Sequence, residues 1–300
     1  MTDPHRPRFL RFIVPLSLVS IALLVCLSQG AMSEGHDARR EPTASWCLYS
    51  PLCYEHDGVP LETENFVVFS DTASDWKKEF VAGQAESAWT EILALLDIES
   101  EEDLAFAPGR TKVDIFLLEE ETPEWGGWAY YGGFLLSPIA CSNVYCSIRT
   151  IKHELMHVLG FLLAGPRSIH GMLVDVWFDE GLAEYVAGTH EITTQGEYEA
   201  RCRELDLVIS GANPVSVHKW DDLATSATGT LGIHAYELFE LAVRYLLDED
   251  GLGRTMDDVR QLYLDLREGY SFVTAFERQF GLPLLQYEVG FQSYMDTYLP

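Results

Sequence analysis

Two histidines and a glutamate stand at metal-site spacing in the stretch IKHELMHVLG, residues 151–160. His153 and His157 are four residues apart, so a helix would place both imidazoles on one face, about 6 Å apart along its axis. Two ring nitrogens at that separation can share one Zn2+ ion. Glu154 lies about 100° round the helix from His153, too far to be a ligand but placed to reach a water on the metal. The spacing therefore predicts a metal-activated water with a carboxylate base beside it.

The alternative is an ordinary amphipathic helix that carries two histidines by coincidence. The remaining residues of the stretch are mostly apolar, so such a helix would bury three polar side chains without partners, which costs several kcal/mol. A shared metal ion removes that cost. We therefore favour the metal site and keep the coincidental helix as the alternative.

The site needs a third ligand, and two known patterns compete for that place. A histidine six residues after His157 is excluded, because position 163 is Leu163. A glutamate from a later helix is available in VWFDEGLAEY, residues 176–185. Glu180 begins a helix there among apolar residues that would pack it inward, and Gly181 permits close approach of the two helices. We therefore expect Glu180 to be the third ligand.

HELMH followed by WFDEGLAEY resembles the gluzincin metallopeptidases, in particular the peptidase MA-like group. The likeness extends over residues 64–297. The order of elements expected in 64–164 is similar to the N-terminal part of that family, and residues 236–251 and 271–295 are similar to its C-terminal helices. The resemblance implies an α+β, zincin-like fold and hydrolysis of peptide bonds in a peptide or protein substrate, with one catalytic Zn2+.

The resemblance also implies roles for individual residues. It makes His153, His157 and Glu180 the zinc ligands, and Glu154 the general base and proton shuttle. A carboxylate at the position of Glu184, one turn after the third ligand, hydrogen-bonds a ligand histidine in this family. Such an outer partner fixes the tautomer of the ring. The alternative for Glu184 is a solvated helix face.

Two further features follow from the resemblance. Similar proteins often carry a tyrosine that stabilises the oxyanion, and Tyr236 stands at the matching place; its alternative is an ordinary core aromatic. His234 is another candidate donor. The resemblance implies that GGFLL, residues 132–136, is the edge strand that holds an extended peptide, and the alternative is a plain sheet strand.

Two other functions remain open at this point. A catalytically inactive metal-binding surface or scaffold protein of the same fold would need no base, so the presence of Glu154 argues against it. A metal hydrolase that acts on non-peptide amides, such as those of a cell-wall component, is compatible with every residue considered so far.

Hydrophobic periodicity predicts the elements that must position these residues. A mixed α/β subdomain, residues 61–164, ends in the histidine-bearing helix, and a helical subdomain, residues 165–300, supplies the third ligand. The expected strands are 64–71, 111–120, 128–138 and 143–148. The expected helices are 74–96, 151–164, 178–187, 194–208, 231–248, 255–267, 271–279 and 284–298.

The N-terminus has the pattern of an export signal. Arginines precede an uncharged, mostly apolar run at 12–27, and small residues follow it. We expect residues 1–30 to be a signal peptide, with a membrane anchor through 12–27 and a lipid anchor on Cys26 as the alternatives. Residues 31–60 are expected to be a tether. The protein would then be periplasmic, extracellular or anchored to the outer face of a membrane.

Cysteine usage and charge limit the compartment and the partners. Cys47 with Cys53, and Cys141 with Cys146, could close short disulfide loops in an oxidising compartment, which leaves Cys202 over; free thiols are the alternative. The formal net charge is −27. Such a surface repels nucleic acid and anionic lipid head groups, so we expect neither as a partner.

Overall fold

The computed structural model describes residues 58–70, 73–118, 126–138, 148–166, 174–205 and 230–298. Contacts divide the chain into Met1–Ser45 and Trp46–Pro300, and every described residue belongs to the second unit. The predicted leader, most of the tether and the four cysteines expected in disulfide loops lie outside the described residues. Within them the fold is mixed α+β, with eight α-helices and a five-stranded sheet.

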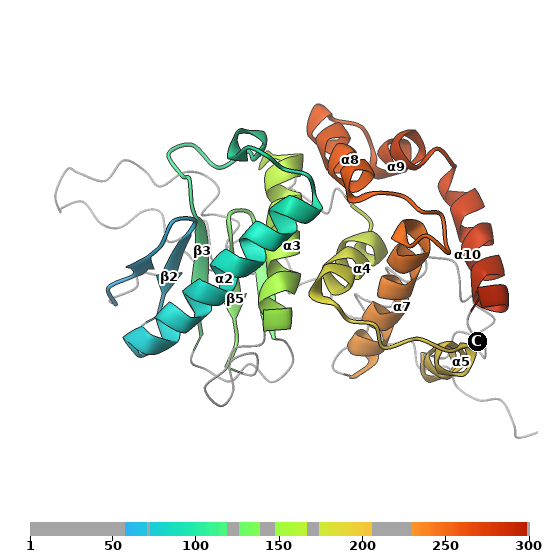
Figure 1. The fold of residues 1–300 in the computed structure, drawn as a ribbon, viewed down its shortest axis with the longest axis horizontal. Coiled ribbons are helices and arrows are strands. Elements are labelled where there is room, and N and C mark those ends of the chain that lie inside the picture. The colour runs from blue at the N-terminus through green and yellow to red at the C-terminus, as the bar shows by residue number, and fades with distance from the viewer. Residues whose placement is uncertain are drawn as a thin grey trace, which may run out of the picture. The chain divides into compact units, whose positions relative to one another are not determined.

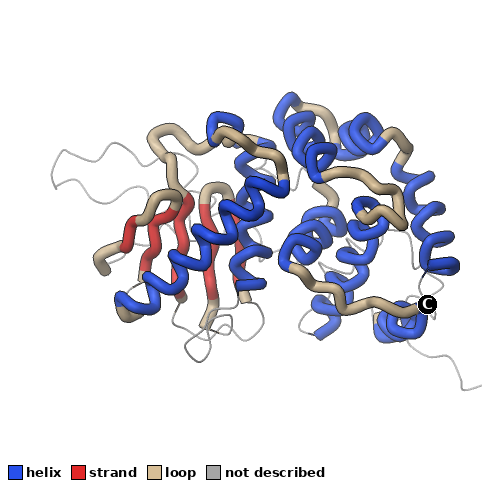
Figure 2. Tube along the Cα trace, viewed as in Figure 1, coloured by secondary structure: helices blue, strands red, loops and turns tan. Residues whose placement is uncertain are grey.

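The sheet is small and mixed (Figures 1 and 2). Its strands are β1 (Leu61–Glu62), β2 (Phe66–Phe69), β3 (Val113–Leu117), β4 (Gly127–Tyr130) and β5 (Gly133–Leu136), in the spatial order β1-β2-β3-β5-β4. β2, β3 and β5 are parallel, and both outer strands run antiparallel to their neighbours. The expected strands at 64–71 and 111–120 are present in shortened form.

Alternation of side chains decides which face of the sheet enters the main core. Phe66 and Val68 of β2 are completely buried in that core, and the residues between and after them are only half-buried. Helix α2 (Asp75–Leu95) covers this face and connects the parallel strands β2 and β3. It begins at Ser74, whose side chain accepts a hydrogen bond from the backbone N–H of Lys77.

The single strand expected at 128–138 is wrong. The chain instead forms a hairpin of β4 and β5, because Gly132 adopts a left-handed conformation with φ of 87° and reverses its direction. GGFLL is also not the edge strand, since β5 lies between β3 and β4. In the described part of the chain, β4 is paired on one side only and forms one edge of the sheet, with β1 at the other. Of the strand expected at 143–148, residues 143–147 lie outside the described ranges and Ile148 opens a helix.

Helix α3 (Ile148–Ala164) is the histidine-bearing helix predicted at 151–164, and it begins three residues earlier than expected. It contacts β4, β5 and α2 on one side, and α4 and α8 on the other. Figure 1 shows it at the boundary between the sheet and the helices that follow. Because both sides are covered, most of α3 is buried, including Glu154 and His157.

The helices that follow agree closely with the predicted ranges. They are α4 (Val176–Ala187), α5 (Gln195–Glu204), α7 (Thr230–Leu247), α8 (Met256–Glu268), α9 (Phe272–Phe280) and α10 (Leu284–Tyr298). Capping boxes at Thr194 and Thr255 open α5 and α8, and left-handed glycines close α4, α8 and α9. Cys202 on α5 is a buried free thiol. No helix among the described residues has the length and apolar character that a bilayer span requires.

Aromatic packing and one glycine fix the position of α4. Trp177 and Phe178 are completely buried and stack among rings of α9 and α10, as expected for residues that pack this helix inward. A Cβ atom on Gly181 would lie 2.6 Å from the carbonyl carbon of Phe239 and 2.9 Å from a methyl carbon of Val243. Gly181 therefore admits the backbone of α7, and not that of the histidine-bearing helix as the sequence suggested.

Replacing Gly181 by alanine is expected to destabilise the fold by about 1–3 kcal/mol, because the new methyl group meets backbone atoms that cannot rotate away. Urea unfolding of the full-length chain measures the change. Gly83→Ala is the matched control, since a Cβ at this exposed position of α2 meets nothing within 4 Å and alanine favours a helix. Equal stability of the two variants would show that α4 can move away from α7 at little cost.

Candidate metal centre

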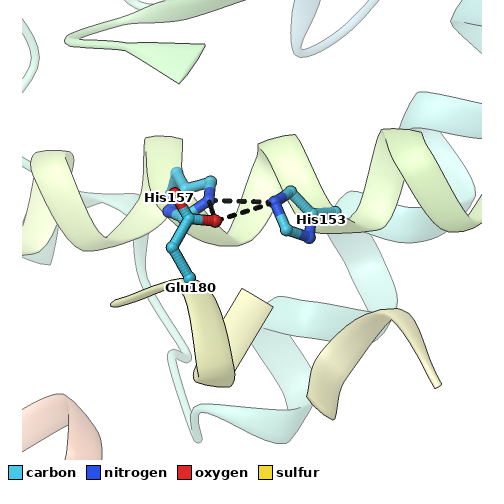
Figure 3. Close-up of side chains that lie close together, drawn as sticks. All are labelled: His153, His157 and Glu180. Carbon is cyan, nitrogen blue, oxygen red and sulfur yellow. Dashed lines mark hydrogen bonds and ion pairs between the residues drawn. The ribbon is translucent and has the colours of Figure 1, made fainter. Parts of the chain in front are cut away.

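Helices α3 and α4 bring His153, His157 and Glu180 together (Figure 3). One oxygen of Glu180 lies 3.3 Å from Nε2 of His153 and 3.3 Å from Nε2 of His157, and the two nitrogens are 3.1 Å apart. The three atoms thus form a nearly equilateral triangle. In Figure 3 the glutamate rises from α4 toward the two rings on α3.

The size of this triangle matches a tetrahedral Zn2+ ion. Ligands at bond lengths of about 2.0–2.1 Å around a tetrahedral ion are about 3.3–3.4 Å apart, and the observed separations are 3.1–3.3 Å. Two imidazoles and one carboxylate are also the donors of many catalytic zinc sites, in which the fourth position is left to water or substrate. The three residues therefore fit a single divalent ion both in geometry and in chemistry.

A carboxylate holds the outer nitrogen of His153. Glu184, one turn after Glu180 on α4, has an oxygen 3.2 Å from Nδ1 of His153. Its other oxygen accepts a hydrogen bond from the hydroxyl of Thr189 and lies 3.3 Å from the guanidinium of Arg149. A proton on Nδ1 directed at Glu184 leaves Nε2 free to bind a cation.

Thr189 reaches Glu184 because of the way in which α4 ends. Gly188 adopts a left-handed conformation with φ of 79°, and the backbone N–H of Thr189 donates to the carbonyl oxygen of Glu184 at 3.0 Å. This turn folds Thr189 back over the last turn of the helix. The hydroxyl group and the backbone of Thr189 therefore both bind Glu184.

His157 has its own carboxylate. Asp179 has an oxygen 3.0 Å from Nδ1 of His157. It contacts the outer nitrogen of this ring as Glu184 contacts that of His153. Both histidines are thus oriented with Nε2 toward Glu180. Neither Asp179 nor Thr189 was predicted from the sequence. The only signals were an acidic residue directly before Glu180 and a hydroxyl residue directly after the glycine that ends the helix.

The carboxylates dominate the electrostatics of the two rings. Burial lowers the pKa of His153, but hydrogen bonds with Glu180 and Glu184 outweigh it and raise that pKa to about 10. Burial likewise opposes the rise for His157, where Asp179 and Glu180 hold the pKa well above its usual value. The centre thus strongly favours positive charge, which is also what a divalent cation requires.

Glu154 lies beside the triangle and under the edge strand. It is only 5% exposed, and burial raises its pKa to about 7 against the opposing effect of the two histidines. A Cβ atom on Gly127 of β4 would lie 2.6 Å from Cγ and 2.7 Å from Cδ of Glu154. The carboxylate side chain therefore occupies the space that a side chain at position 127 would need.

Tyr236 on α7 also lies beside the triangle of His153, His157 and Glu180. Its ring centroid is 6.5 Å from that of His153, and its side chain lies near the carboxylate of Glu180. Burial, and then the nearby carboxylate of Glu180, raise the pKa of Tyr236, so this phenol remains a donor. The side chain of His234, the other donor considered from the sequence, lies outside the described residues.

All six residues expected at the site therefore converge from three helices. No protein-family model matches the chain, and no curated protein matches it. The interpretation of the site consequently depends on its own geometry. That geometry can hold one divalent cation, orient both of its histidine ligands and keep one carboxylate, Glu154, beside it.

Proposed function

We propose that this protein is a zinc-dependent metallopeptidase of the gluzincin type with a zincin-like fold. The observation that carries the proposal is the triangle of His153, His157 and Glu180, with the buried Glu154 beside it. A purely structural metal site is usually closed by four protein ligands, whereas three ligands with a neighbouring carboxylate suit catalysis.

Glu154 and Tyr236 have different roles in the proposed hydrolysis. Zinc bound to the three ligands would polarise a carbonyl group and lower the pKa of a water molecule. Glu154 takes the proton from the attacking water and delivers it to the leaving nitrogen, a role suited to a carboxyl group whose pKa burial raises to about 7. Tyr236 retains its proton and can donate a hydrogen bond to the oxyanion.

The edge strand β4 offers a place for an extended substrate. Ser137 donates a backbone hydrogen bond to the carbonyl of Gly126 at 2.9 Å, and Gly127 pairs with Leu136. Because inward and outward groups alternate in an antiparallel ladder, the backbone N–H and C=O groups of Gly127 and Ala129 face away from β5. A peptide that pairs with these groups would pass next to Glu154, since Gly127 touches its side chain.

Replacing Gly127 by alanine should lower kcat by about 100-fold without loss of bound metal. The added methyl group needs the space of Cγ and Cδ of Glu154, so that side chain must turn away, and displacements of about 1 Å can have effects of this size. Steady-state kinetics and metal quantification on the same preparation measure both quantities.

Gly83→Ala serves again as the control, because it adds the same methyl group at an exposed site far from the metal ligands in sequence. It should leave kcat and metal content unchanged. A Gly127→Ala variant as active as Gly83→Ala would mean that the position of Glu154 does not limit catalysis.

Metal quantification combined with a mixed peptide library tests the proposed function directly. The full-length protein should contain about one zinc ion per chain. It should cleave peptides, lose that activity to a chelator and regain it with added zinc. Bound metal without any peptide cleavage would overturn the peptidase assignment and favour the inactive metal-binding protein or a hydrolase of non-peptide amides. The absence of bound metal would remove the entire proposal.

A further inference from the structure

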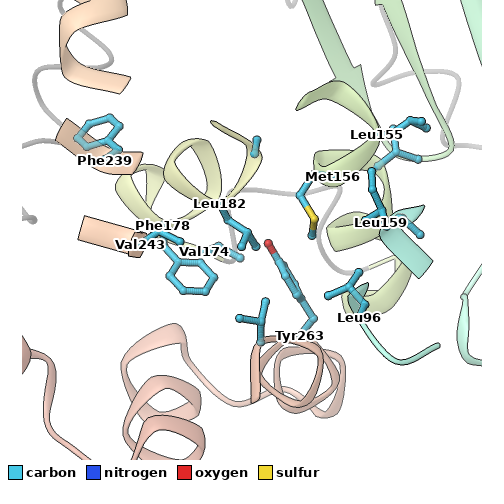
Figure 4. Close-up of a cluster of buried hydrophobic side chains, with 14 of the residues drawn as sticks. Leu96, Leu155, Met156, Leu159, Val174, Phe178, Leu182, Phe239, Val243 and Tyr263 are labelled. Carbon is cyan, nitrogen blue, oxygen red and sulfur yellow. The ribbon is translucent and has the colours of Figure 1, made fainter. Parts of the chain in front are cut away.

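Tyr263 of α8 is a buried tyrosine in the middle of an apolar cluster (Figure 4). It is only 2% exposed, and Leu96, Met156 and Leu182 lie around its ring. Within the described part of the chain its hydroxyl makes one hydrogen bond, to Oδ1 of Asp179 at 3.4 Å. A buried hydroxyl group without a partner is unfavourable, so this contact accounts for a polar atom in an otherwise apolar region.

Asp179 links Tyr263 to the metal centre. Its Oδ1 atom accepts from Tyr263, while its Oδ2 atom lies 3.0 Å from Nδ1 of His157. The hydroxyl of Tyr263 is therefore two contacts away from the outer nitrogen of His157. Burial, and then the charge of Asp179, raise the pKa of Tyr263 well above its usual value, so the hydroxyl stays protonated and is the donor in this pair.

The two ligand histidines are held by chains of the same form. His153 contacts Glu184, which accepts a hydrogen bond from the hydroxyl of Thr189. His157 contacts Asp179, which accepts a hydrogen bond from the hydroxyl of Tyr263. The first chain connects α3 with α4 and with Thr189 just beyond its end, whereas the second connects three helices, α3, α4 and α8.

Gly160 gives the ring of Tyr263 the space that it needs. A Cβ atom on Gly160 would lie 2.9 Å from Cζ of Tyr263 and 3.0 Å from its hydroxyl oxygen. Gly160 stands one turn after His157 on α3, so the phenol lies against the backbone beside the ligand that it supports. Any larger residue at position 160 would push the hydroxyl away from Asp179.

We propose that Tyr263 is a positioning residue of the metal centre, which holds Asp179 so that Asp179 fixes the ring of His157 with Nε2 toward the metal. This inference rests on the proposed function, since it assigns Tyr263 a role toward the metal that the centre would bind. Outer partners of ligand histidines typically change metal affinity by about 10–100-fold, and Tyr263 acts one contact further out than Asp179.

The test uses the full-length protein and measures zinc affinity by competition with a chelator. Tyr263→Phe keeps the ring and removes only the hydroxyl, and it should raise the dissociation constant by about 10-fold. Tyr287→Phe is the matched control, because Tyr287 is also completely buried in the helical part and its hydroxyl donates to the carbonyl of Ala242 at 2.7 Å. This control should leave the zinc affinity unchanged.

Two further measurements separate positioning from general stability. The absorption spectrum of the Co2+-loaded protein reports ligand geometry and should change in Tyr263→Phe but not in Tyr287→Phe. Asp179→Asn retains an oxygen that can accept from Nδ1 of His157, so it should lose less zinc affinity than Asp179→Ala. A merely structural role would give no such ranking.

The outcomes distinguish this inference from the proposed function. If the wild-type protein binds zinc and Tyr263→Phe matches Tyr287→Phe in affinity and in Co2+ spectrum, the positioning role is wrong and the metal centre stands. If the wild-type protein binds no zinc, the proposed function fails and the inference fails with it.

Discussion

Replacing Glu154 by glutamine is expected to leave zinc binding intact and to lower peptide hydrolysis by about 100- to 10,000-fold. The amide has nearly the same shape as the carboxylate but cannot take a proton from water. None of the three proposed ligand atoms belongs to Glu154. Peptide cleavage and zinc content, measured on one preparation of each protein, test both halves of this expectation.

The Glu154→Gln variant should also fold normally. Burial raises the pKa of Glu154 to about 7, which means that the ionised carboxylate is unfavourable at this position. A neutral amide removes that unfavourable charge, so the melting temperature should not fall. A loss of activity in this variant would therefore reflect chemistry and not unfolding.

Glu86→Gln is the matched control for the same chemical change. Glu86 on α2 accepts hydrogen bonds from Thr63 and Asn65, and we assign it no part in the proposed chemistry. This variant should retain both activity and zinc. Cleavage by Glu154→Gln at the rate of the Glu86→Gln control would mean that another group accepts the proton.

Local sequence patterns were sufficient to predict the helices that carry the site. The spacing of His153 and His157 requires only that α3 be helical, and apolar periodicity identified that helix correctly. The apolar Trp177 and Phe178 likewise indicated that α4 packs into the core, and both are completely buried. These inferences needed no knowledge of how distant segments meet.

Contacts between distant segments could not be predicted from local sequence patterns. Asp179 could be assigned to His157 only once the relative placement of α3 and α4 was known, and Tyr263 lies 84 residues beyond Asp179. The contact of Gly127 with Glu154 depends on the hairpin at Gly132, where the sequence pattern predicts a single strand. A shift of one residue in that hairpin would have turned a different side chain toward Glu154.

Replacing Glu180 by alanine should abolish stoichiometric zinc binding. Glu180 supplies the only oxygen of the triangle, and its carboxylate lies between the two ring nitrogens. Loss of an outer partner of a ligand histidine costs about 10–100-fold in affinity, so the loss of a ligand itself should exceed that range. Zinc quantification and chelator competition on the full-length chain measure the change.

Glu184→Ala provides the comparison that identifies the ligand. It removes a carboxylate from the same helix, one turn away, that contacts the outer nitrogen of His153 and supplies none of the three proposed ligand atoms. We therefore expect weakened but detectable zinc binding in Glu184→Ala and none in Glu180→Ala, with both variants still helical by circular dichroism. Two histidines alone leave the cation without a negative ligand, and Glu180 is the residue that closes the triangle. Zinc retained by Glu180→Ala at wild-type affinity would exclude it as the third ligand, and the gluzincin assignment would lose its basis.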